Sequence, residues 1–430
     1  MSEIPERARQ LLENPHPVDR ADLDAIEAWA KQFSISGPNE VEQAAWAIDV
    51  IDLLIRWRRY ETAWQLLRRI GSSLRSDDSE TTRKHMLLFE RAGRLKLDLG
   101  EVEQALELMQ NSLECARDLL DDERSHLSLR DYAVSLDNVA DLEVAMDLSR
   151  QAFERYEESL AIRRELVGEF GETSESLRDV SLLSLARIAD LERAAGNNTA
   201  ALERYVESLE IQKEILRRFD PSLQAERDVL VSLGRIGSCA MSLNRPQEAG
   251  KRFEESISVA RSVLAKYGSS PEALRDLSVS LEQMGGLWRA ARHPATAQKF
   301  YSEGLEIRRR ILCDFPRALE ALRDLSVSLE ACGDVQQAMG EREATLDNFR
   351  ECLDLRRQIL GEFGDAGDGL LEGAVACGRI VGIVGVASEE GDDRFREGWA
   401  MLESAIEQFG PDPQFTRALD WFKSMGPLKS

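Results

Sequence analysis

The side chains that most often carry out catalysis occur in this sequence, but they do not form a catalytic pattern. The four histidines are isolated, and no H-E-x-x-H or H-x-x-x-H spacing places two of them on one helix face, so a zinc site is not expected. These histidines are His16, His85, His126 and His293. A serine or cysteine nucleophile needs an oriented base, and no histidine stands in such a pairing. We therefore expect no enzymatic activity, no metal and no cofactor.

Phosphate-binding and redox motifs are missing as well. No G-x-x-x-x-G-K-[ST] segment occurs, and Gly378, Gly382 and Gly385 lie in an apolar run without a preceding strand, which favours close helix packing over dinucleotide binding. The six cysteines form no C-x-x-C pair and lie within helical patterns, where cysteine acts as a small buried hydrophobe. They are Cys115, Cys239, Cys313, Cys332, Cys352 and Cys377. Cysteines of this kind, without a disulfide pattern, fit a protein of the reducing cytoplasm.

An Arg-Asp pair recurs along the chain in steps of 48 or 49 residues. The pairs begin at Arg130, Arg178, Arg227, Arg275 and Arg323. Opposite charges side by side invite a functional interpretation, but a feature shared by every main unit is expected to be structural. We expect each Asp to complement a helix N-terminus and each Arg to reach carboxylates of the preceding helix. A fixed period of this length predicts a stacked array of one supersecondary unit.

The unit itself is predicted to be a helical hairpin. Within residues 274–315, apolar residues recur at three- and four-residue spacing on two successive helix faces. The first face contains Leu277, Leu281, Met284 and Trp288, and the second contains Ala297, Tyr301, Gly304 and Ile307. Pro294 suits the first turn of the second helix. We name the two helices of each unit helix A and helix B.

Several positions are repeated in all the main units. A small residue in the middle of helix A would let helix B approach closely; it is Gly93, Ala140, Ala189, Gly237, Gly285 or Gly333. The turn follows seven residues later at Gly100, Asp147, Gly196, Asn244, Arg292 or Gly340, and Gly and Asn accept the left-handed backbone that ends a helix. An aromatic residue also recurs near the end of helix B, at Phe170, Phe219, Tyr267, Phe315 and Phe363. We expect these aromatics to form core between adjacent units.

This pattern of small, turn, alanine, aromatic and small residues resembles the tetratricopeptide repeat (TPR). The resemblance is strong for residues 79–363. The usual unit has about 34 residues, and the longer one here, with the segments Ser159 to Arg164 and Gly304 to Arg309, is similar to the long-helix variant of kinesin light chains and to bacterial multi-repeat proteins. The resemblance implies an all-α, right-handed superhelical solenoid of about eight repeats that binds proteins or peptides on a surface lined by helix A.

The domain organisation follows from the repeats. We expect an N-terminal cap over residues 1–38, a degenerate hairpin over 39–78 and six long repeats over 79–366. A degenerate C-terminal repeat over 367–410 and a capping helix and tail over 411–430 would complete the chain. Atypical end units are what capping of a solenoid requires.

Composition limits the partners. The 430-residue chain has a formal net charge of −23, so nucleic acid would be repelled. Its most apolar stretch, residues 373–388, is interrupted by Arg379 and is too short to span a bilayer. The N-terminus lacks the layout of a signal peptide. We therefore expect a cytoplasmic protein, of bacterial type, that contacts neither nucleic acid nor membrane.

Function should lie where the units differ on the inner face of helix A. The candidate partner-binding residues flank the small residue of that helix. They are Glu90, Arg94, Asp137, Asp141, Arg187, Asp190, Arg193, Arg235, Glu282, Arg289, Glu330 and Asp334. None is Lys, so the chain lacks the Lys/Asn clamp with which related domains hold chaperone tails. Each could equally be a solvated residue in an intramolecular ion pair.

The N-terminal end is a second candidate surface. It contains Trp29, Trp46, Trp57 and Trp64. Aromatic residues anchor interfaces, but they also fill the cores of capping units, which is the interpretation that we favour. If an end repeat is left uncapped, self-association could occur there.

Two non-enzymatic functions remain open. The first is a scaffold that binds a protein or peptide partner in the groove. The alternative is a peptide- or effector-sensing regulatory subunit that controls a separately encoded signalling or protease protein. A subunit that completes an enzyme's composite site is a third hypothesis.

Overall fold

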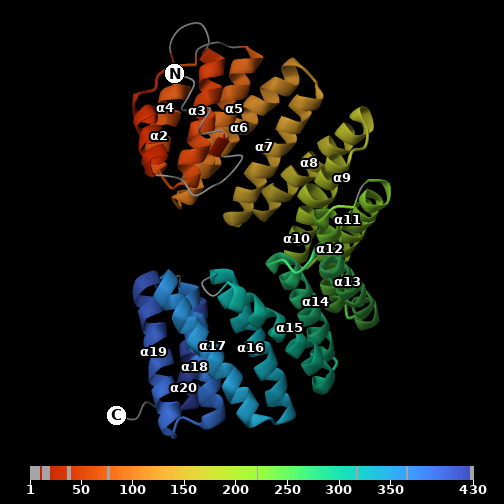
Figure 1. Ribbon diagram of the computed structural model, residues 1–430, viewed down its shortest axis with the longest axis vertical. Helices are drawn as coiled ribbons and strands as arrows, with labels where there is room; N and C mark the ends of the chain where they lie inside the picture. The colour runs from red at the N-terminus through yellow and green to blue at the C-terminus, as the bar shows by residue number, and fades with distance from the viewer. Residues whose placement is uncertain are drawn as a thin grey trace. The chain divides into compact units, whose positions relative to one another are not determined.

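The computed structural model describes residues 10–11, 20–35, 40–74, 78–219, 221–315, 318–364 and 367–426, and every regular element within these ranges is a helix (Figure 1). The all-α repeat fold predicted from the sequence is confirmed. Parts of the predicted N-terminal cap, including His16, and residues 427–430 of the predicted tail lie outside the described residues.

The chain divides into two compact units, residues 1–215 and 216–430. The first unit contains α2 (Arg20–Gln32), α3 (Glu40–Arg56), α4 (Tyr60–Gly71), α5 (Ser79–Asp98), α6 (Val102–Asp122), α7 (His126–Ala145), α8 (Ser149–Phe170), α9 (Ser174–Arg178), η1 (Asp179–Leu185) and α10 (Ala186–Ala194). The division falls within α11 (Asn198–Arg218). The second unit contains α12 (Leu223–Ser242), α13 (Pro246–Tyr267), α14 (Pro271–Ala290), α15 (Pro294–Asp314), α16 (Leu319–Met339), α17 (Arg342–Phe363), α18 (Gly367–Val384), α19 (Glu389–Phe409) and α20 (Pro413–Met425).

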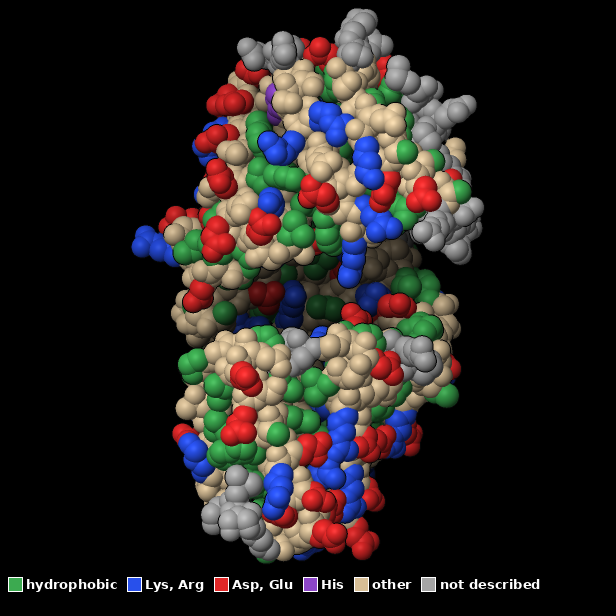
Figure 2. Space-filling view, turned by 90° about the vertical axis from the view of Figure 1, so that its left-hand side faces the viewer, with side chains coloured by type: hydrophobic (Ala, Val, Ile, Leu, Met, Phe, Trp, Pro, Cys, Tyr) green, Lys and Arg blue, Asp and Glu red, His purple; other side chains and the backbone are tan. Residues whose placement is uncertain are grey.

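Helices A and B alternate within each unit. Helix A is α5, α7 or the segment α9–η1–α10 in the first unit, and α12, α14 or α16 in the second. Each is followed by its helix B, and the same alternation holds for the flanking hairpins α3/α4 and α18/α19. Basic and acidic side chains are intermixed over the face shown in Figure 2, as expected for helices with solvated outer sides.

The predicted close approach and the predicted turns are both confirmed. A Cβ added to Gly285 would lie 2.9 Å from Cε1 of Tyr301 on the next helix, so no larger residue fits there without movement. The turn residues have positive φ even where they are not glycine: 61° at Asp147, 57° at Asn244 and 60° at Arg292. A single left-handed residue therefore reverses the chain between helix A and helix B.

One repeat step has 49 residues because of a local insertion. The step from Arg178 to Arg227 exceeds its neighbours by one residue, and between these two positions the structure contains a π-helix over Asp179–Leu185. A π-turn absorbs one extra residue without ending the helix. The following residues, from Ala186 onward, thereby return to the register of the other repeats.

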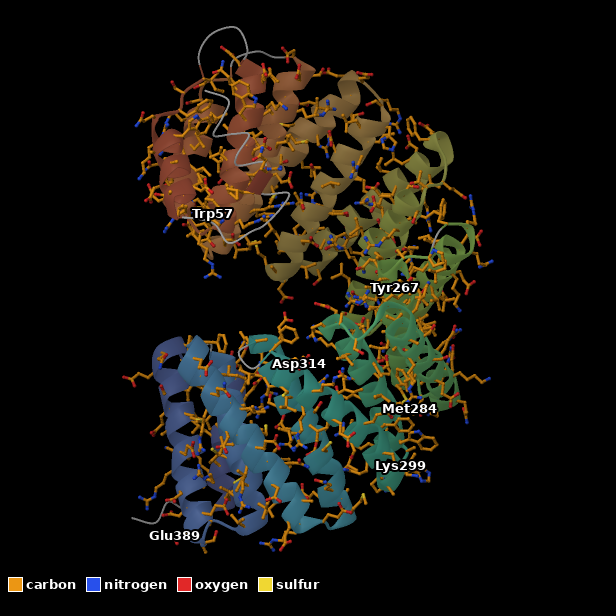
Figure 3. The ribbon with its side chains drawn as sticks, in the orientation of Figure 1. Trp57, Tyr267, Met284, Lys299, Asp314 and Glu389 are labelled. Atoms are coloured by element: carbon orange, nitrogen blue, oxygen red, sulfur yellow. The ribbon has the colours of Figure 1, made fainter. Side chains whose placement is uncertain are left out.

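The recurring aromatics do not form core between units, and that prediction is wrong. Phe170, Tyr267, Phe315 and Phe363 are between 37% and 49% exposed. Tyr267 lies at the last position of α13 (Figure 3), and its hydroxyl donates a hydrogen bond to the Pro221 carbonyl at the start of its own repeat. These four side chains lie at the C-terminal ends of their B helices. Phe219, just after α11, is half-buried.

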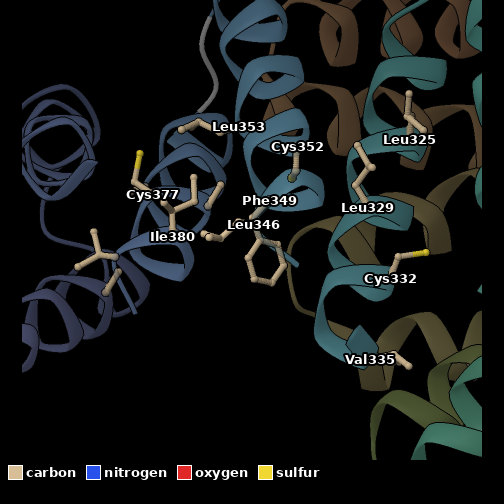
Figure 4. Packing of buried hydrophobic residues seen from close by; sticks show 14 of the residues in the cluster. Leu325, Leu329, Cys332, Val335, Leu346, Phe349, Cys352, Leu353, Cys377 and Ile380 are labelled. Carbon is tan, nitrogen blue, oxygen red and sulfur yellow. The ribbon is translucent and has the colours of Figure 1, made fainter. Parts of the chain in front are cut away.

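The core instead lies between the middle segments of the helices. Figure 4 shows Leu329, Cys332, Phe349 and Cys352 in the cluster that α16, α17 and the following helices enclose. Burial raises the pKa of the Cys332 and Cys352 thiols to about 12, so they remain protonated and pack as small hydrophobes. Cys313 is exposed and Cys115 is half-buried, which corrects the expectation for these two.

The tryptophans of the N-terminal end take part in a local core. Trp29, Trp57 and Trp64 are partly buried and pack against the cluster that includes Ile51, Leu54 and Leu66. Their contribution to a capping core was the favoured interpretation of the sequence.

Candidate functional site

The exposed side of the A helices has an apolar centre that the sequence interpretation overlooked. In α14, Leu277, Leu281 and Met284 are buried, and helical periodicity places Val279 on the opposite side. Val279 is 37% exposed, and Val231 of α12 and Val327 of α16 are 42% and 50% exposed. We call this side the A-helix face and these three residues the valine row. The signal was the recurrence of Val four residues after the Arg of the last three Arg-Asp pairs.

Four of the predicted partner-binding carboxylates face into the protein from the flank of this face. They occupy one register, three residues before the small residue of helix A: Glu90, Asp137, Glu282 and Glu330. Oε2 of Glu282 lies 2.7 Å from Nη2 of Arg308, and Oε2 of Glu330 lies 2.8 Å from Nη2 of Arg356. Asp137 pairs with Arg163 in the same way.

The arginines in these pairs are buried on helix B of the same repeat. Arg163, Arg308 and Arg356 are 3–4% exposed. Sequence reasoning missed their role, although Arg163 and Arg308 lie in the segments that resemble kinesin light chains. A buried guanidinium needs an acid and further acceptors, and Arg308 also donates to the backbone carbonyl of Asp324.

Repeats that lack the carboxylate also lack the arginine. At the two matching positions the third main repeat has Ala186 and Gln212, and the fourth has Gly234 and Ala260. Gln212 is buried and donates to the Ser208 hydroxyl at 3.1 Å. In the first main repeat Glu90 stands opposite Ala116 and pairs with Arg91 and Arg94 of its own helix. The pair across the two helices therefore forms in three of the six main repeats, where it helps to pack helix A on helix B.

Burial has the largest effect on the pKa values of these acids. Desolvation raises the pKa of Glu282 above its usual range, and the Arg308 charge only partly opposes this effect. Desolvation also raises the pKa of Asp137 against the opposing charge of Arg163. Neither carboxylate is displayed to solvent as a freely accessible ligand for a partner.

A second register contains carboxylates held by tyrosines. Asp141 and Asp190 accept hydrogen bonds from the hydroxyls of Tyr156 and Tyr205 on the following helix B. Arg187 Nη1 lies 2.8 Å from Asp141 Oδ1 without hydrogen-bond alignment, and its guanidinium lies 5.6 Å from the Tyr156 ring centroid. Burial and the neighbouring Asp141 raise the pKa of Tyr156. Its hydroxyl therefore stays protonated and donates the hydrogen bond to Asp141.

The remaining predicted residues are more accessible. Arg94 is exposed and pairs with Glu90 at 2.6 Å. Arg289 is exposed and lies 3.3 Å from Asp334, which Arg379 also contacts. Two further arginines complete the set: Arg193 is exposed and Arg235 is half-buried.

The Arg-Asp pairs connect successive A helices, which corrects both roles predicted for them. Nε and Nη2 of Arg275 lie 2.6 and 3.3 Å from the two carboxylate oxygens of Asp324 in the next repeat. Arg227 makes the same two-pronged contact with Asp276. The arginine therefore reaches the next A helix and not a preceding B helix, and Asp276 lies beyond the first turn of α14.

Neither a metal-binding cluster nor a membrane-spanning helix is found in the described part of the chain. No group of three or more His, Cys, Asp or Glu side chains among the described residues could hold a metal ion. None of the helices in those ranges is both long and apolar enough to cross a bilayer. What the A-helix face offers chemically is an apolar row between fixed opposite charges, which suits recognition of another chain.

Comparisons with known proteins indicate the fold of this chain. The family model described as anaphase-promoting complex subunit 5 matches residues 51–130, 110–169 and 198–264. No curated protein matches the sequence. The apo form of RapI is 9% identical over 89% of this chain and 97% of that one, with a TM-score of 0.54.

Two further crystal structures are less similar in overall superposition. BtubC (BKLC) from P. vanneervenii is 17% identical over 62% of this chain and 94% of that chain, with a TM-score of 0.48. The apo form of the quorum sensor NprR from B. thuringiensis is 12% identical over 99% and 96% of the two chains, with a TM-score of 0.46. Together with the repeated helical hairpins and the left-handed turns described above, these comparisons show that the chain has the tetratricopeptide-repeat fold.

Proposed function

We propose that this protein is a non-enzymatic scaffold that binds a protein or peptide partner along the A-helix face of its second unit. The observation that carries the proposal is the valine row, Val231, Val279 and Val327, exposed in one register on three consecutive A helices. Exposed apolar residues are ordinary when scattered. A row repeated at the repeat period gives a partner a continuous apolar contact.

The charges beside the row favour a polypeptide partner. The carboxylates of Glu282 and Glu330 are already held by arginines, so little side-chain freedom is lost when a partner docks. Arg275 and Arg323 are exposed one turn before Val279 and Val327. They provide polar contacts at the rim of an apolar strip, which is the usual anatomy of an interface. The net charge of −23 disfavours nucleic acid.

The test starts from a random peptide library selected on the immobilised full chain. Selected peptides should bind the Val279→Asp/Val327→Asp double variant at least about tenfold more weakly, because two carboxylates would enter the apolar contact. Met339→Asp is the matched control, since Met339 is also exposed, at 38%, but at the end of α16. Equal affinity for the double variant and the wild type would refute the proposed face.

Charge reversal tests the arginines predicted from the sequence. The sequence predicts that charge reversal at Arg187, Arg193 or Arg235 abolishes partner capture while the circular dichroism spectrum stays helical. Of these residues Arg235 lies in the second unit, so Arg235→Glu should weaken capture of the peptides selected above, whereas Arg187→Glu and Arg193→Glu, in the first unit, should not. The Arg187 variant also breaks the contact with Asp141, so its stability must be measured alongside. Unchanged capture by all three variants would count against the groove.

The regulatory alternative has one favourable observation, the π-helix over Asp179–Leu185 in the middle of a helix A segment. Such interruptions often mark hinges. A sensing subunit would change its radius of gyration in small-angle X-ray scattering when a selected peptide is added, whereas a passive scaffold would not.

A further inference from the structure

We propose that the first unit contains a separate small-molecule site: a slot between α4, α5 and α6 that binds a molecule with one unbranched apolar chain and one carboxylate. This inference is independent of the partner proposed for the A-helix face. It concerns other residues in the other unit, and it assigns a ligand class that the repeat architecture by itself does not imply.

The slot is large enough for a ligand and is lined mainly by apolar side chains. Its volume is about 420 Å³, within the range of small-molecule sites. The lining residues are Trp64, Leu67, Arg68, Gly71, His85, Leu88, Phe89, Ala92, Leu108 and Cys115. The lining contains no acidic residue, although acids are the most abundant charged residues of this chain.

The slot exists because α4 is short. It has 12 residues, whereas the B helices of the six main repeats have 21 or 22. Elsewhere neighbouring B helices are joined across the intervening groove by ion pairs, such as Arg309 with Glu351 and Arg357 with Glu397. Among the described residues, α4 and α6 form no such pair. The groove over α5 therefore lacks an ion pair that would close it.

The shape of the slot favours an extended chain. Each of the three helices lines it over a stretch of eight residues, from Trp64 to Gly71 on α4, from His85 to Ala92 on α5 and from Leu108 to Cys115 on α6. The rise along such a stretch of helix, from its first residue to its last, is about 10 Å. Three helices that run alongside one another over this length enclose an elongated space and not a spherical one.

The two ends of the slot differ in polarity. The helix α5 runs antiparallel to α6, since Ser112 contacts the Met86 carbonyl and Gly93 faces Met109. It also runs antiparallel to α4, since Lys96 lies 4.6 Å from the Trp64 ring. His85 therefore lies at the end of the slot marked by Gly71 and Cys115. The opposite end is formed by Trp64, Ala92 and Leu108 and is apolar.

A carboxylate fits the end that contains His85. Arg68 lines the slot one turn after Trp64, its side chain is exposed, and it forms no ion pair with any residue in the described ranges. A guanidinium is the preferred partner of a carboxylate, and an imidazole N–H can donate a second hydrogen bond. Burial raises the pKa of the Cys115 thiol to about 11, with smaller contributions from the charges of Asp118 and Glu114, so Cys115 is a neutral lining residue and not a nucleophile. These two carboxylates do not line the slot, so the cation that faces the ligand there is Arg68.

The experiment is isothermal titration calorimetry of the full chain with sodium decanoate below its aggregation concentration. We expect saturable binding of one molecule per chain. Decyltrimethylammonium, which has the same chain length but the opposite charge, should bind at least tenfold more weakly. Equal affinity for the two probes, or no saturable binding of decanoate up to millimolar concentration, would overturn the proposed ligand class.

Two variants locate the binding. Gly71→Leu should reduce decanoate affinity at least tenfold, because a Cβ at Gly71 meets nothing within 4 Å and the new side chain would occupy the slot. Arg68→Glu should reverse the preference between the two probes. The matched controls are Gly168→Leu and Arg150→Glu, at open, exposed positions of α8. Wild-type affinity in Gly71→Leu would show that decanoate binds elsewhere and would end the proposal.

Discussion

At the residue scale, the arginine–carboxylate pairs between helix A and helix B show how a repeat uses a buried charge. Glu282 and Arg308 are both largely withdrawn from water, and the matching positions of the third main repeat have Ala186 and Gln212. Buried pairs contribute little net stability compared with well-packed neutral residues, but loss of one partner is costly. This difference explains why the third and fourth main repeats, which lack the carboxylate, also lack the arginine, and why Glu90 of the first main repeat has arginine partners on its own helix.

Replacement of one member should therefore cost more than replacement of both. Arg308→Gln leaves the Glu282 carboxylate buried without its cation, and we expect the free energy of unfolding to fall by about 3 kcal/mol. The double variant Glu282→Ala/Arg308→Gln copies the neutral repeat and should lie within about 1 kcal/mol of wild type. Urea denaturation measures both. A double variant that is less stable than the single one would contradict the interpretation.

Part of this site could be predicted from the sequence. The predicted acids lie on the A helices, but their side chains face arginines that the sequence interpretation treated only as part of a family resemblance. Spacing identifies the helix face of a residue, whereas the choice between solvent and a partner on the next helix depends on packing distances. For the same reason the burial of the recurring aromatics was predicted wrongly: periodicity places Phe315 at the end of α15 but does not show how far a neighbouring helix covers its side chain, which is 47% exposed.

At the element scale, the π-helix shows how an irregular repeat length is tolerated. One extra residue in a continuous α-helix would rotate all later side chains by about 100° and expose the buried face. In the segment that contains η1 (Asp179–Leu185), Ser184 remains buried like Ser232, its counterpart in the next repeat. The insertion is thus absorbed within two turns. Sequence numbering located this irregularity to within a few residues but could not specify its form.

We expect the deletion of one residue to be tolerated in the π-helix but not at the matching place of another A helix. Deletion of Leu182 restores the 48-residue step, and the helix should close as a regular α-helix with a thermal midpoint close to that of the wild type. Deletion of Leu230, at the matching place in α12, removes a buried residue and shifts the register by one, so its midpoint should fall strongly. Circular dichroism melting compares the two variants. Similar losses in both would show that the π-turn is not the point of insertion.

At the scale of the whole molecule, an excess of acidic residues coexists with dense local pairing of charges. The net charge is −23, yet buried carboxylates such as Asp137 and Glu282 have an arginine within contact distance. The excess negative charge is therefore carried mainly by exposed Asp and Glu side chains. Each unit keeps its repeats together by apolar contacts and paired charges, while the surplus negative charge opposes compaction in a way that salt and protons can screen.

Stability should rise when the pH is lowered moderately. The folded pKa values of Asp137 and Glu282 are raised by desolvation, above the value of about 4 expected in the unfolded chain. This contribution is fully present below the unfolded pKa and is lost as the pH rises through the folded pKa. The urea midpoint at constant ionic strength should thus be higher at pH 5 than at pH 7. The Asp137→Asn/Glu282→Gln variant should show a smaller difference, and a lower midpoint at pH 5 in the wild type would contradict the argument.

The contact of Arg275 with Asp324 has a consequence for how such an array can change in length. Arg227 makes the same contact with Asp276, so the repeat that contains Arg275 and Asp276 carries both the donor for its successor and the acceptor for its predecessor. Loss of residues 276–323 by recombination would bring Arg275 directly before Asp324. This deletion recreates the same Arg-Asp dipeptide, so the shortened repeat could make the same contacts with the repeats on either side. The gene could therefore gain or lose whole modules in one event, without compensating mutations, and natural variation in module number is the outcome that this architecture permits.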